Sequence, residues 1–165
     1  MKGVLHTDGG ARGNPGPAGI GVVLEGENGG GYQELGRSIG EATNNVAEYT
    51  ALIAGLELAL ERGISEIEIY VDSELIASQV KGQWKIKNDR LRALAARAQS
   101  LMDRFESASI TPVRRHLNTR ADELANKAMD EAATNGWPDR NPSGLPSRMA
   151  LDLDDGLAAE VADDA

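Results

Sequence analysis

The sequence contains no cysteine. That absence excludes disulfide frameworks, thiolate zinc sites and cysteine nucleophiles together. It fits a protein of a reducing compartment, and we therefore expect a cytoplasmic location. A chain of 165 residues is the size of one ordinary domain, and it can bury a self-sufficient hydrophobic core without such staples.

Long hydrophobic runs are also missing. No stretch approaches the ~18 consecutive apolar residues of a membrane-spanning helix. The first eight residues contain one lysine and no apolar run of signal-peptide length. We therefore expect a soluble, unexported protein with no membrane partner, and we expect it to act as a monomer.

A surplus of basic residues, usual in nucleic-acid-binding domains, is missing from the chain as a whole, whose formal net charge is −9. The distribution of charge matters more than this total. Residues 151–165 carry six acidic side chains and no basic one, whereas residues 81–120 carry ten basic side chains and three acidic ones. A basic face of this kind suits phosphate recognition, although a helix with a solvated basic face is an equally ordinary explanation.

Hydrophobic periodicity predicts an α/β domain over residues 1–135. The expected strands span residues 4–8, 19–25, 32–39, 64–71 and 107–113, and the expected helices span 43–62, 73–81, 89–104 and 119–133. Short turns between the first three strands favour an antiparallel meander, and the later alternation of strands and helices implies parallel crossovers. We therefore expect a five-stranded mixed sheet flanked by helices, with a glycine- and proline-rich connection over residues 9–19.

Residues 136–165 contain prolines, glycines and the acidic run but no regular hydrophobic period. We interpret this segment as a disordered tail, with a linker toward a second domain as the alternative. Its negative charges could compete with nucleic acid for the basic face, or they could only keep the tail solvated.

Four acidic residues stand at the ends of predicted elements. Asp8 and Asp72 close the first and fourth strands, and Glu48 and Asp122 lie in the first turns of two helices. Each has an ordinary explanation when taken singly. Glu48 can form a capping box with Asn45, Asp72 can cap the following helix, Asp122 can favour a positive helix end, and Asp8 can begin a turn.

Taken together, the four acids indicate metal chemistry. If the first and fourth strands are parallel neighbours, Asp8 and Asp72 emerge side by side at the sheet edge where α/β proteins place ligands. Clustered carboxylates repel one another, and a divalent cation with a preference for oxygen ligands, Mg²⁺ or Mn²⁺, removes that conflict. Two such ions can activate a water and stabilise the leaving oxygen of a phosphodiester. The pattern therefore predicts a nuclease.

Four segments carry a family resemblance: DGGARGNPGPAG (8–19), TNNVAEYTAL (43–52), YVDSELI (70–76) and NTRADELAN (118–126). They resemble the signature segments of ribonuclease H type 1, in the same order and at similar separations, and the resemblance extends from about residue 2 to residue 134. It implies an RNase H-like fold, with strands 1–3 antiparallel and strands 1, 4 and 5 parallel. It also implies hydrolysis of the RNA strand of RNA–DNA hybrids, leaving 5′-phosphate and 3′-hydroxyl ends.

The resemblance implies that Asp8, Glu48, Asp72 and Asp122 are both the catalytic residues and the ligands of two Mg²⁺ or Mn²⁺ ions. In the family's scheme, Asp8 would bridge both ions and Asp122 would serve the ion that activates water. Glu48 and Asp72 would serve the other ion.

Recognition of a hybrid requires contact with the ribose 2′-hydroxyl. By resemblance, the amides of Asn14, Asn44 and Asn45 and the backbone of residues 9–13 would supply it, since an amide both donates and accepts hydrogen bonds. Turn and cap roles for these asparagines are the alternative, and both roles can coexist. The full set of expected substrate-binding residues is Gly9, Gly10, Arg12, Asn14, Thr43, Asn44, Asn45, Ser73, Trp84, Lys85, Lys87, Arg115 and Asn118.

The chain resembles the bacterial and archaeal members that lack a long basic protrusion, because only residues 82–87 separate the two central helices. Substrate contact is then expected from the basic surface around Trp84, Lys85 and Lys87. Trp84 would either contact the DNA strand or pack between the helices.

The main departure from the family pattern concerns histidine. Many relatives place a flexible-loop histidine well before the last aspartate, whereas here the segment 111–118 is short and arginine-rich, with His116 close to Asp122. We predict an auxiliary role for His116 or Arg115, with simple phosphate contact as the alternative. His6, in the first strand, is predicted to serve packing.

Other functions fit the sequence less well. A hybrid-binding module without activity should have lost at least one of the four acids. A nucleotide-binding loop over residues 9–19 would need a Lys-Ser/Thr ending or a dinucleotide fingerprint, and it has neither. A nuclease of related fold that acts on double-stranded RNA or on DNA junctions is the main rival, since the same metal chemistry serves both, and double-stranded RNA is a second candidate partner.

Overall fold

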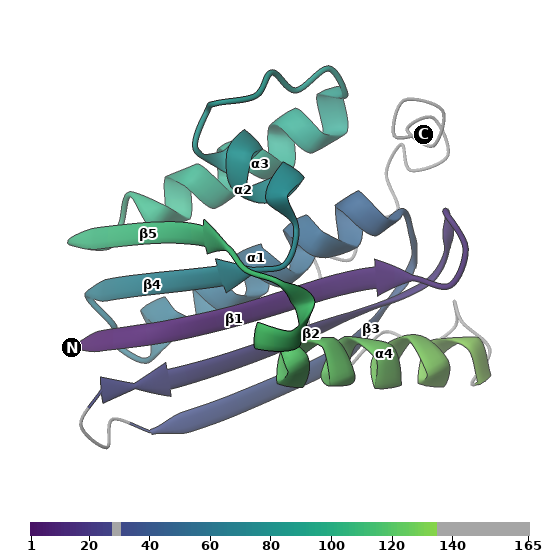
Figure 1. Ribbon diagram of the computed structural model, residues 1–165, viewed down its shortest axis with the longest axis horizontal. Coiled ribbons are helices and arrows are strands. Elements are labelled where there is room, and N and C mark those ends of the chain that lie inside the picture. The colour runs from purple at the N-terminus through teal and green to yellow at the C-terminus, as the bar shows by residue number, and fades with distance from the viewer. Residues whose placement is uncertain (28–30, 135–165) are drawn as a thin grey trace.

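The computed structural model describes residues 1–27 and 31–134, which form a mixed sheet with helices on both faces (Figure 1). The strands are β1 (Lys2–Ala11), β2 (Gly16–Gly26), β3 (Tyr32–Ala42), β4 (Glu66–Val71) and β5 (Ser107–Pro112). The helices are α1 (Asn44–Glu61), α2 (Glu74–Val80), α3 (Asp89–Met102) and α4 (Thr119–Thr134), with a short 3₁₀ helix, η2 (Arg115–Leu117). The tail predicted for residues 136–165 lies outside the described residues.

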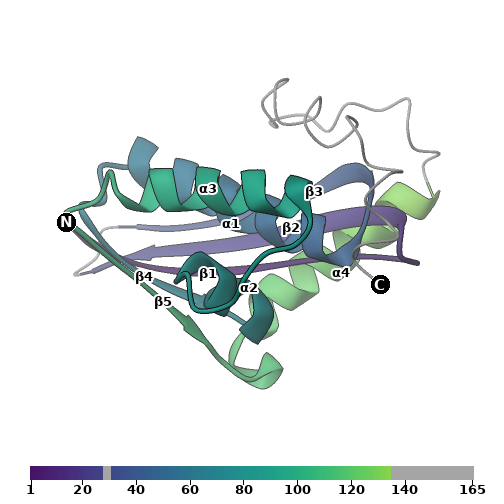
Figure 2. The ribbon, with the colours of Figure 1, turned by 90° about the horizontal axis from the view of Figure 1, so that it is seen from above.

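The strand order is β3-β2-β1-β4-β5. β1 pairs with β2, and β2 with β3, in antiparallel fashion, whereas β1 pairs with β4, and β4 with β5, in parallel. This topology confirms the predicted mixed sheet. Figure 2 shows α1 and α3 on one face of the sheet and α4 on the other. Among the described residues, none of the helices combines the length and the hydrophobicity that a membrane crossing requires.

β1 is longer than predicted, and the difference affects the site. The strand continues past Asp8 to Ala11, which pairs with Ala18, so the predicted connection over residues 9–19 shrinks to residues 12–15. Glycine in a strand often marks a close approach of another backbone. Here a Cβ on Gly9 would overlap the carbonyl oxygen of Ala47 in α1. Gly9 therefore lets α1 pack directly on β1. Because the strand is longer than predicted, Asp8 lies within it rather than at its end.

Small residues also set the position of α4. A Cβ on Gly21 of β2 would overlap the carbonyl oxygen of Ala121, and a Cβ on Gly19 would stand 2.7 Å from the Cβ of Ala128. Ala121 and Ala125 are fully buried on the facing side of the helix. The helix backbone therefore lies almost directly on the sheet, with Asp122 in its first turn.

Candidate active site

Three aspartates from distant parts of the chain converge at one edge of the sheet. Asp8, Asp72 and Asp122 each offer a carboxylate oxygen, and these atoms all lie within 4.8 Å of one another. The parallel register pairs Thr7 with Val71, so the residues that follow, Asp8 and Asp72, are neighbours. The structure thus confirms the predicted adjacency of the first and fourth strands and brings Asp122 to the same place.

Glu48 is not one of the three grouped aspartates. It lines the same pocket. The capping-box explanation for Glu48 fails, because the N-cap of α1 is Thr43, whose side-chain oxygen accepts a hydrogen bond from the Val46 N–H at 3.2 Å. The cap explanation for Asp72 fails likewise, because Ser73 caps α2 by accepting from the Ile76 N–H at 3.1 Å.

The pKa values of two buried carboxyl groups, those of Asp8 and Glu48, are strongly raised. Burial, then the charge of Asp72, and further the hydrogen bond and charge of Asp122 raise the pKa of Asp8 to about 9. Burial is the largest cause that raises the pKa of Glu48 to about 7, while a hydrogen bond from Ser73 opposes the shift. Without a cation, the pocket therefore favours protonated over ionised carboxyls.

The carboxylates line an open pocket of about 420 Å³. The other expected residues that line it are Gly9, Gly10, Arg12, Asn44, Ser73 and Arg115. Asn126 and Met129 also line it and were missed from the sequence. They stand one and two turns after Asp122 on α4, so helical spacing from Asp122 was the signal that would have found them.

Asparagine side chains hold the loop beside the pocket. The Oδ1 atom of Asn44 accepts a hydrogen bond from the Ala11 N–H at 2.8 Å, and the Oδ1 atom of Asn14 accepts from the Asn44 N–H at 3.0 Å. Asn14 and Asn44 therefore have structural roles in the loop, but the predicted alternative of a cap at Asn44 and Asn45 is wrong, because Thr43 is the N-cap of α1. Thr43 is 1% exposed, so its place as the cap of α1 leaves it no surface for the substrate contact that we expected.

Asn118 is also placed differently from the prediction. Its side chain is 1% exposed, and the side-chain Nδ2 atom donates to the backbone carbonyl oxygen of Thr7 at 2.9 Å. The backbone carbonyl oxygen of Asn118 accepts a hydrogen bond from the Asp122 N–H at 3.1 Å. A buried side chain has no surface with which to contact a substrate, contrary to our expectation. Asn118 instead joins the residue before Asp8 to the first turn of α4.

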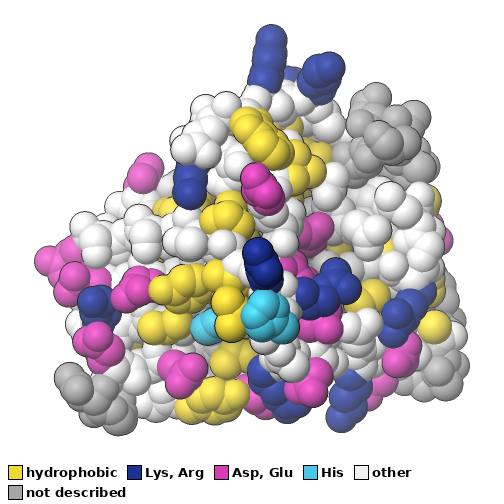
Figure 3. All heavy atoms as spheres, in the orientation of Figure 1, with side chains coloured by type: hydrophobic (Ala, Val, Ile, Leu, Met, Phe, Trp, Pro, Cys, Tyr) yellow, Lys and Arg dark blue, Asp and Glu magenta, His cyan; other side chains and the backbone are white. Residues whose placement is uncertain are grey.

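The expected basic surface lies in the segment between α2 and α3. Trp84 is 47% exposed, which contradicts the alternative that it packs between helices. Lys85 and Lys87 are exposed beside it. Figure 3 shows Lys and Arg side chains projecting from the end of the molecule where this segment lies in Figure 1.

Part of the basic surplus of residues 81–120 is neutralised by folding. Arg97 pairs with Glu57 at 2.8 Å. Arg92 pairs with Asp89 within α3, and Arg120 is held by two acids. The effective positive surface is therefore smaller than the sequence balance indicates.

Arg115, not His116, reaches the carboxylates. The Nε atom of Arg115 lies 3.5 Å from Asp72 Oδ2, and its side chain is 76% exposed. His116 follows it in η2, exposed and outside the pocket lining. His6 packs as predicted, with its ring centroid 5.2 Å from that of Tyr70, and burial lowers the pKa of this imidazole.

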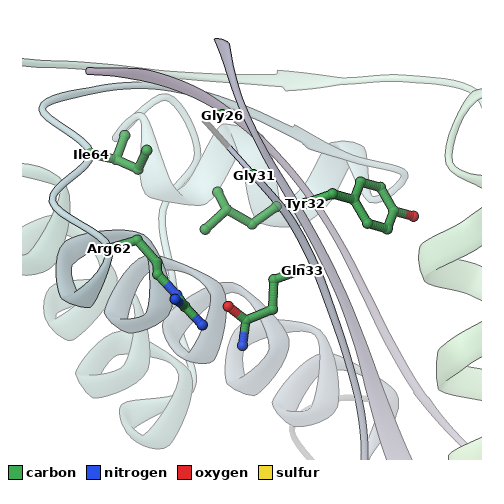
Figure 4. Close-up of a pocket in the computed structure, with 7 residues that line it drawn as sticks. Gly26, Gly31, Tyr32, Gln33, Arg62 and Ile64 are labelled. Atoms are coloured by element: carbon green, nitrogen blue, oxygen red, sulfur yellow. The ribbon is translucent and has the colours of Figure 1, made fainter. Parts of the chain in front are cut away.

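A second pocket lies at the opposite end of β1, where β2 ends and β3 begins. It measures about 210 Å³ and holds no carboxylate. Figure 4 shows its lining, in which the Tyr32 ring points away from the other labelled residues. The lining residues are Leu24, Gly26, Gly31, Tyr32, Gln33, Arg62 and Ile64.

Comparisons with known proteins agree with this geometry. A family model described as reverse transcriptase-like matches residues 6–128. A ribonuclease HI of Halobacterium salinarum is 50% identical over 77% of this chain and 64% of its own length. The chain belongs to the ribonuclease H type 1 family. The segment between α2 and α3 is short, as the sequence resemblance to members without a basic protrusion implies.

Two further relatives place this ribonuclease H domain in context. A Mycobacterium tuberculosis protein described as bifunctional is 46% identical over 88% of this chain, which spans 40% of the length of that relative. A crystal structure of LC11-RNase H1 in complex with an RNA/DNA hybrid has a TM-score of 0.73 and 43% identity, and the match covers 80% of this chain and 99% of that one.

Proposed function

We propose that this chain is an endonuclease that hydrolyses the RNA strand of RNA–DNA hybrids with two divalent ions, Mg²⁺ or Mn²⁺, leaving 5′-phosphate and 3′-hydroxyl ends. The observation that carries the proposal is the convergence of Asp8, Asp72 and Asp122 within 4.8 Å. Membership of the ribonuclease H family and the hybrid complex of LC11-RNase H1 support it.

The side chains present fit such ions. All the donors are carboxylate oxygens, which hard divalent cations prefer. Burial, and to a smaller extent the charge of Asp72, raises the pKa values of Asp8 and Glu48, and a bound cation would favour their ionised forms. Asp8, Asp72 and Asp122 would hold the ions, together with Glu48, which lines the same pocket. When bound, the ions supply an activated water and stabilise the leaving oxygen.

The loop beside the pocket is proposed to recognise the RNA strand by hydrogen bonds to its ribose 2′-hydroxyls. The hydrogen bonds within the loop use the Oδ1 atoms of Asn14 and Asn44, and we assign their amide nitrogens, with those of Asn45, to the 2′-hydroxyls. Because the loop bonds fix these side chains before the substrate arrives, little ordering is needed on binding. Gly9, Gly10, Arg12 and Ser73 are proposed substrate contacts at the same pocket.

Arg115 is proposed to contact the phosphate that is cleaved. It stands beside Asp72, and a guanidinium suits phosphate because its planar fork offers several donors. Arginine stays protonated, so Arg115 would supply charge rather than move a proton. A proton-transfer role remains proposed for His116, which neighbours it. Trp84, Lys85 and Lys87 are proposed to contact the DNA strand at a distance from the chemistry.

Parallel cleavage assays test the proposal. End-labelled RNA–DNA hybrid, double-stranded RNA and double-stranded DNA are incubated with Mg²⁺, with Mn²⁺ and with chelator. We expect cleavage of the hybrid with metal, none with chelator, and none of double-stranded DNA. Cleavage of double-stranded RNA as fast as hybrid would replace the proposed substrate with a broader one. Absence of metal-dependent cleavage of any RNA strand would contradict the proposal.

A further inference from the structure

The first turn of α4, which carries Asp122, is tied to the edge strand β3 by Arg120. The Nε atom of Arg120 donates to Glu34 Oε2 at 2.6 Å, and its Nη2 atom donates to Glu34 Oε1 at 2.8 Å. This is a forked, two-bond contact between residues 86 positions apart. A third bond runs from Nη1 to Glu123 Oε1 at 3.2 Å.

Glu34 is itself fixed in place. The Tyr32 hydroxyl donates to Glu34 Oε2 at 2.5 Å, and Tyr32 and Glu34 stand on the same face of β3 because side chains alternate along a strand. The hydrogen bonds from Arg120 and then from Tyr32 lower the pKa of Glu34 to about 2. Glu34 is therefore ionised near neutral pH, as the two-bond contact with Arg120 requires.

The packing of α4 explains why such a tether is useful. Contact with Gly19 and Gly21 sets how closely the helix approaches the sheet, and polar contacts at its start add a restraint on its direction. Asn118 ties the helix start to β1. Arg120 ties the first turn to β3, on the other side of β2. Farther along the helix, the Ser38 hydroxyl of β3 donates to the Ala128 carbonyl oxygen at 2.9 Å and Arg12 pairs with Asp130 at 2.7 Å. Arg120 therefore makes the polar contact with β3 that lies nearest to Asp122.

We propose that Arg120 and Glu34 are positioning residues that hold Asp122 against Asp8 and Asp72 for metal binding. The inference rests on the proposed function, because it takes Asp122 to be a metal ligand. A two-bond arginine–carboxylate contact adds geometric specificity, whereas an exposed ion pair contributes little to global stability. Loss of the pair should therefore weaken metal binding while leaving the fold intact.

The test uses the full chain and the variants Arg120→Gln, Arg120→Lys, Glu34→Gln and the double glutamine variant. Glu57→Gln is the matched control, because it breaks the Arg97–Glu57 pair between α3 and α1. For each protein, calorimetry measures Mn²⁺ affinity without substrate, and cleavage of hybrid gives kcat and KM. Thermal unfolding reports whether the fold is intact.

We expect Arg120→Gln to weaken Mn²⁺ binding and lower kcat by roughly 10-fold, as for other residues that orient metal ligands, with KM for the hybrid nearly unchanged. Lysine cannot reproduce the fork, so Arg120→Lys should recover only part of the affinity. The double variant should be no worse than either single variant, because both remove one interaction.

Wild-type Mn²⁺ affinity in Arg120→Gln would overturn the inference, and so would an equal loss in Glu57→Gln, since that would mark a general effect of surface ion pairs. If the wild type binds Mn²⁺ but cleaves no hybrid, the proposed function fails alone, and the Mn²⁺ affinities still decide the positioning role. Absence of Mn²⁺ binding by the wild type would overturn both.

Discussion

Asn118 donates a hydrogen bond of 2.9 Å to the carbonyl oxygen of Thr7, although the two residues stand 111 positions apart. The bond joins Thr7, the residue before Asp8, to Asn118. The backbone carbonyl oxygen of Asn118 accepts a hydrogen bond from the Asp122 N–H. One buried side chain thus connects the two elements that supply two of the three clustered aspartates. The spacing of these aspartates depends on interactions outside the cluster itself.

Substitution of Asn118 tests that connection. Asn118→Ala leaves the Thr7 carbonyl oxygen buried without its donor, which should lower the free energy of unfolding by about 1–3 kcal/mol. Mn²⁺ affinity should fall as well, because α4 and β1 lose a shared anchor. Chemical denaturation and calorimetry measure the two effects. Unchanged Mn²⁺ affinity in a destabilised protein would show that Asn118 supports the fold without orienting the site.

Asp72→Asn separates chemistry from substrate binding. The change removes one proposed metal ligand but leaves the exposed Trp84, Lys85 and Lys87 unaltered. Because phosphate contacts dominate affinity for nucleic acids, hybrid binding should stay within about threefold of wild type while cleavage is abolished. Fluorescence anisotropy with labelled hybrid and the end-label assay measure the two. Loss of both, with altered circular dichroism, would indicate misfolding rather than a catalytic role.

The metal-free protein should become less stable as pH rises. The ordinary pKa values of Asp8 and Glu48 are 3.8 and 4.5, and folding raises them to about 9 and about 7. Between those limits the folded state binds more protons than the unfolded state. The free energy of unfolding should therefore fall as pH rises from about 4 to about 9.

Divalent ions should reverse that trend, since metal binding displaces the same protons. Mn²⁺ should raise Tm more at about pH 8 than at about pH 5. Thermal unfolding across pH, with and without Mn²⁺, measures both effects. Asp8→Asn serves as the control, because it removes the more strongly shifted group and should flatten the metal-free profile. A profile equally steep in Asp8→Asn would contradict this account.

The close packing of α4 predicts a contrast between two glycines. A Cβ on Gly21 would overlap the carbonyl oxygen of Ala121, whereas a Cβ on Gly36 would meet Leu124 at an ordinary distance of 3.5 Å. Gly21→Ala should destabilise the protein by about 1–3 kcal/mol or more through overpacking and displace Asp122. Gly36→Ala should be tolerated. Denaturation and Mn²⁺ binding by both variants test the contrast, and equal tolerance would contradict it.

The difference between the predicted and observed β1 has a physical cause. Glycine has little preference for strands, so residues 9–19 carried the pattern of a connection. The pairing of Ala11 with Ala18 and the approach of α1 to Gly9 override that local tendency. Local sequence patterns also cannot show which charges pair across the fold. The positive charge of residues 81–120 was therefore overestimated, because Arg97 and Arg120 pair with acids that precede them by dozens of residues.

The sequence alone determined the element order, the mixed sheet and the identity of the four acids. Hydrophobic periodicity is a local property of the chain, and the four family segments that contain the acids could be read directly. The structure places Asp8 inside β1 and Glu48 beyond the first turn of α1, whereas the sequence pattern predicts both at element ends. Only the tertiary structure decided that the three aspartates converge without Glu48 in the group, that Asn118 is buried, and that Arg120 donates two hydrogen bonds to Glu34. Those outcomes depend on contacts between residues far apart in the sequence, 111 positions for Asn118 and Thr7, and their geometry arises only when α4 packs on the sheet.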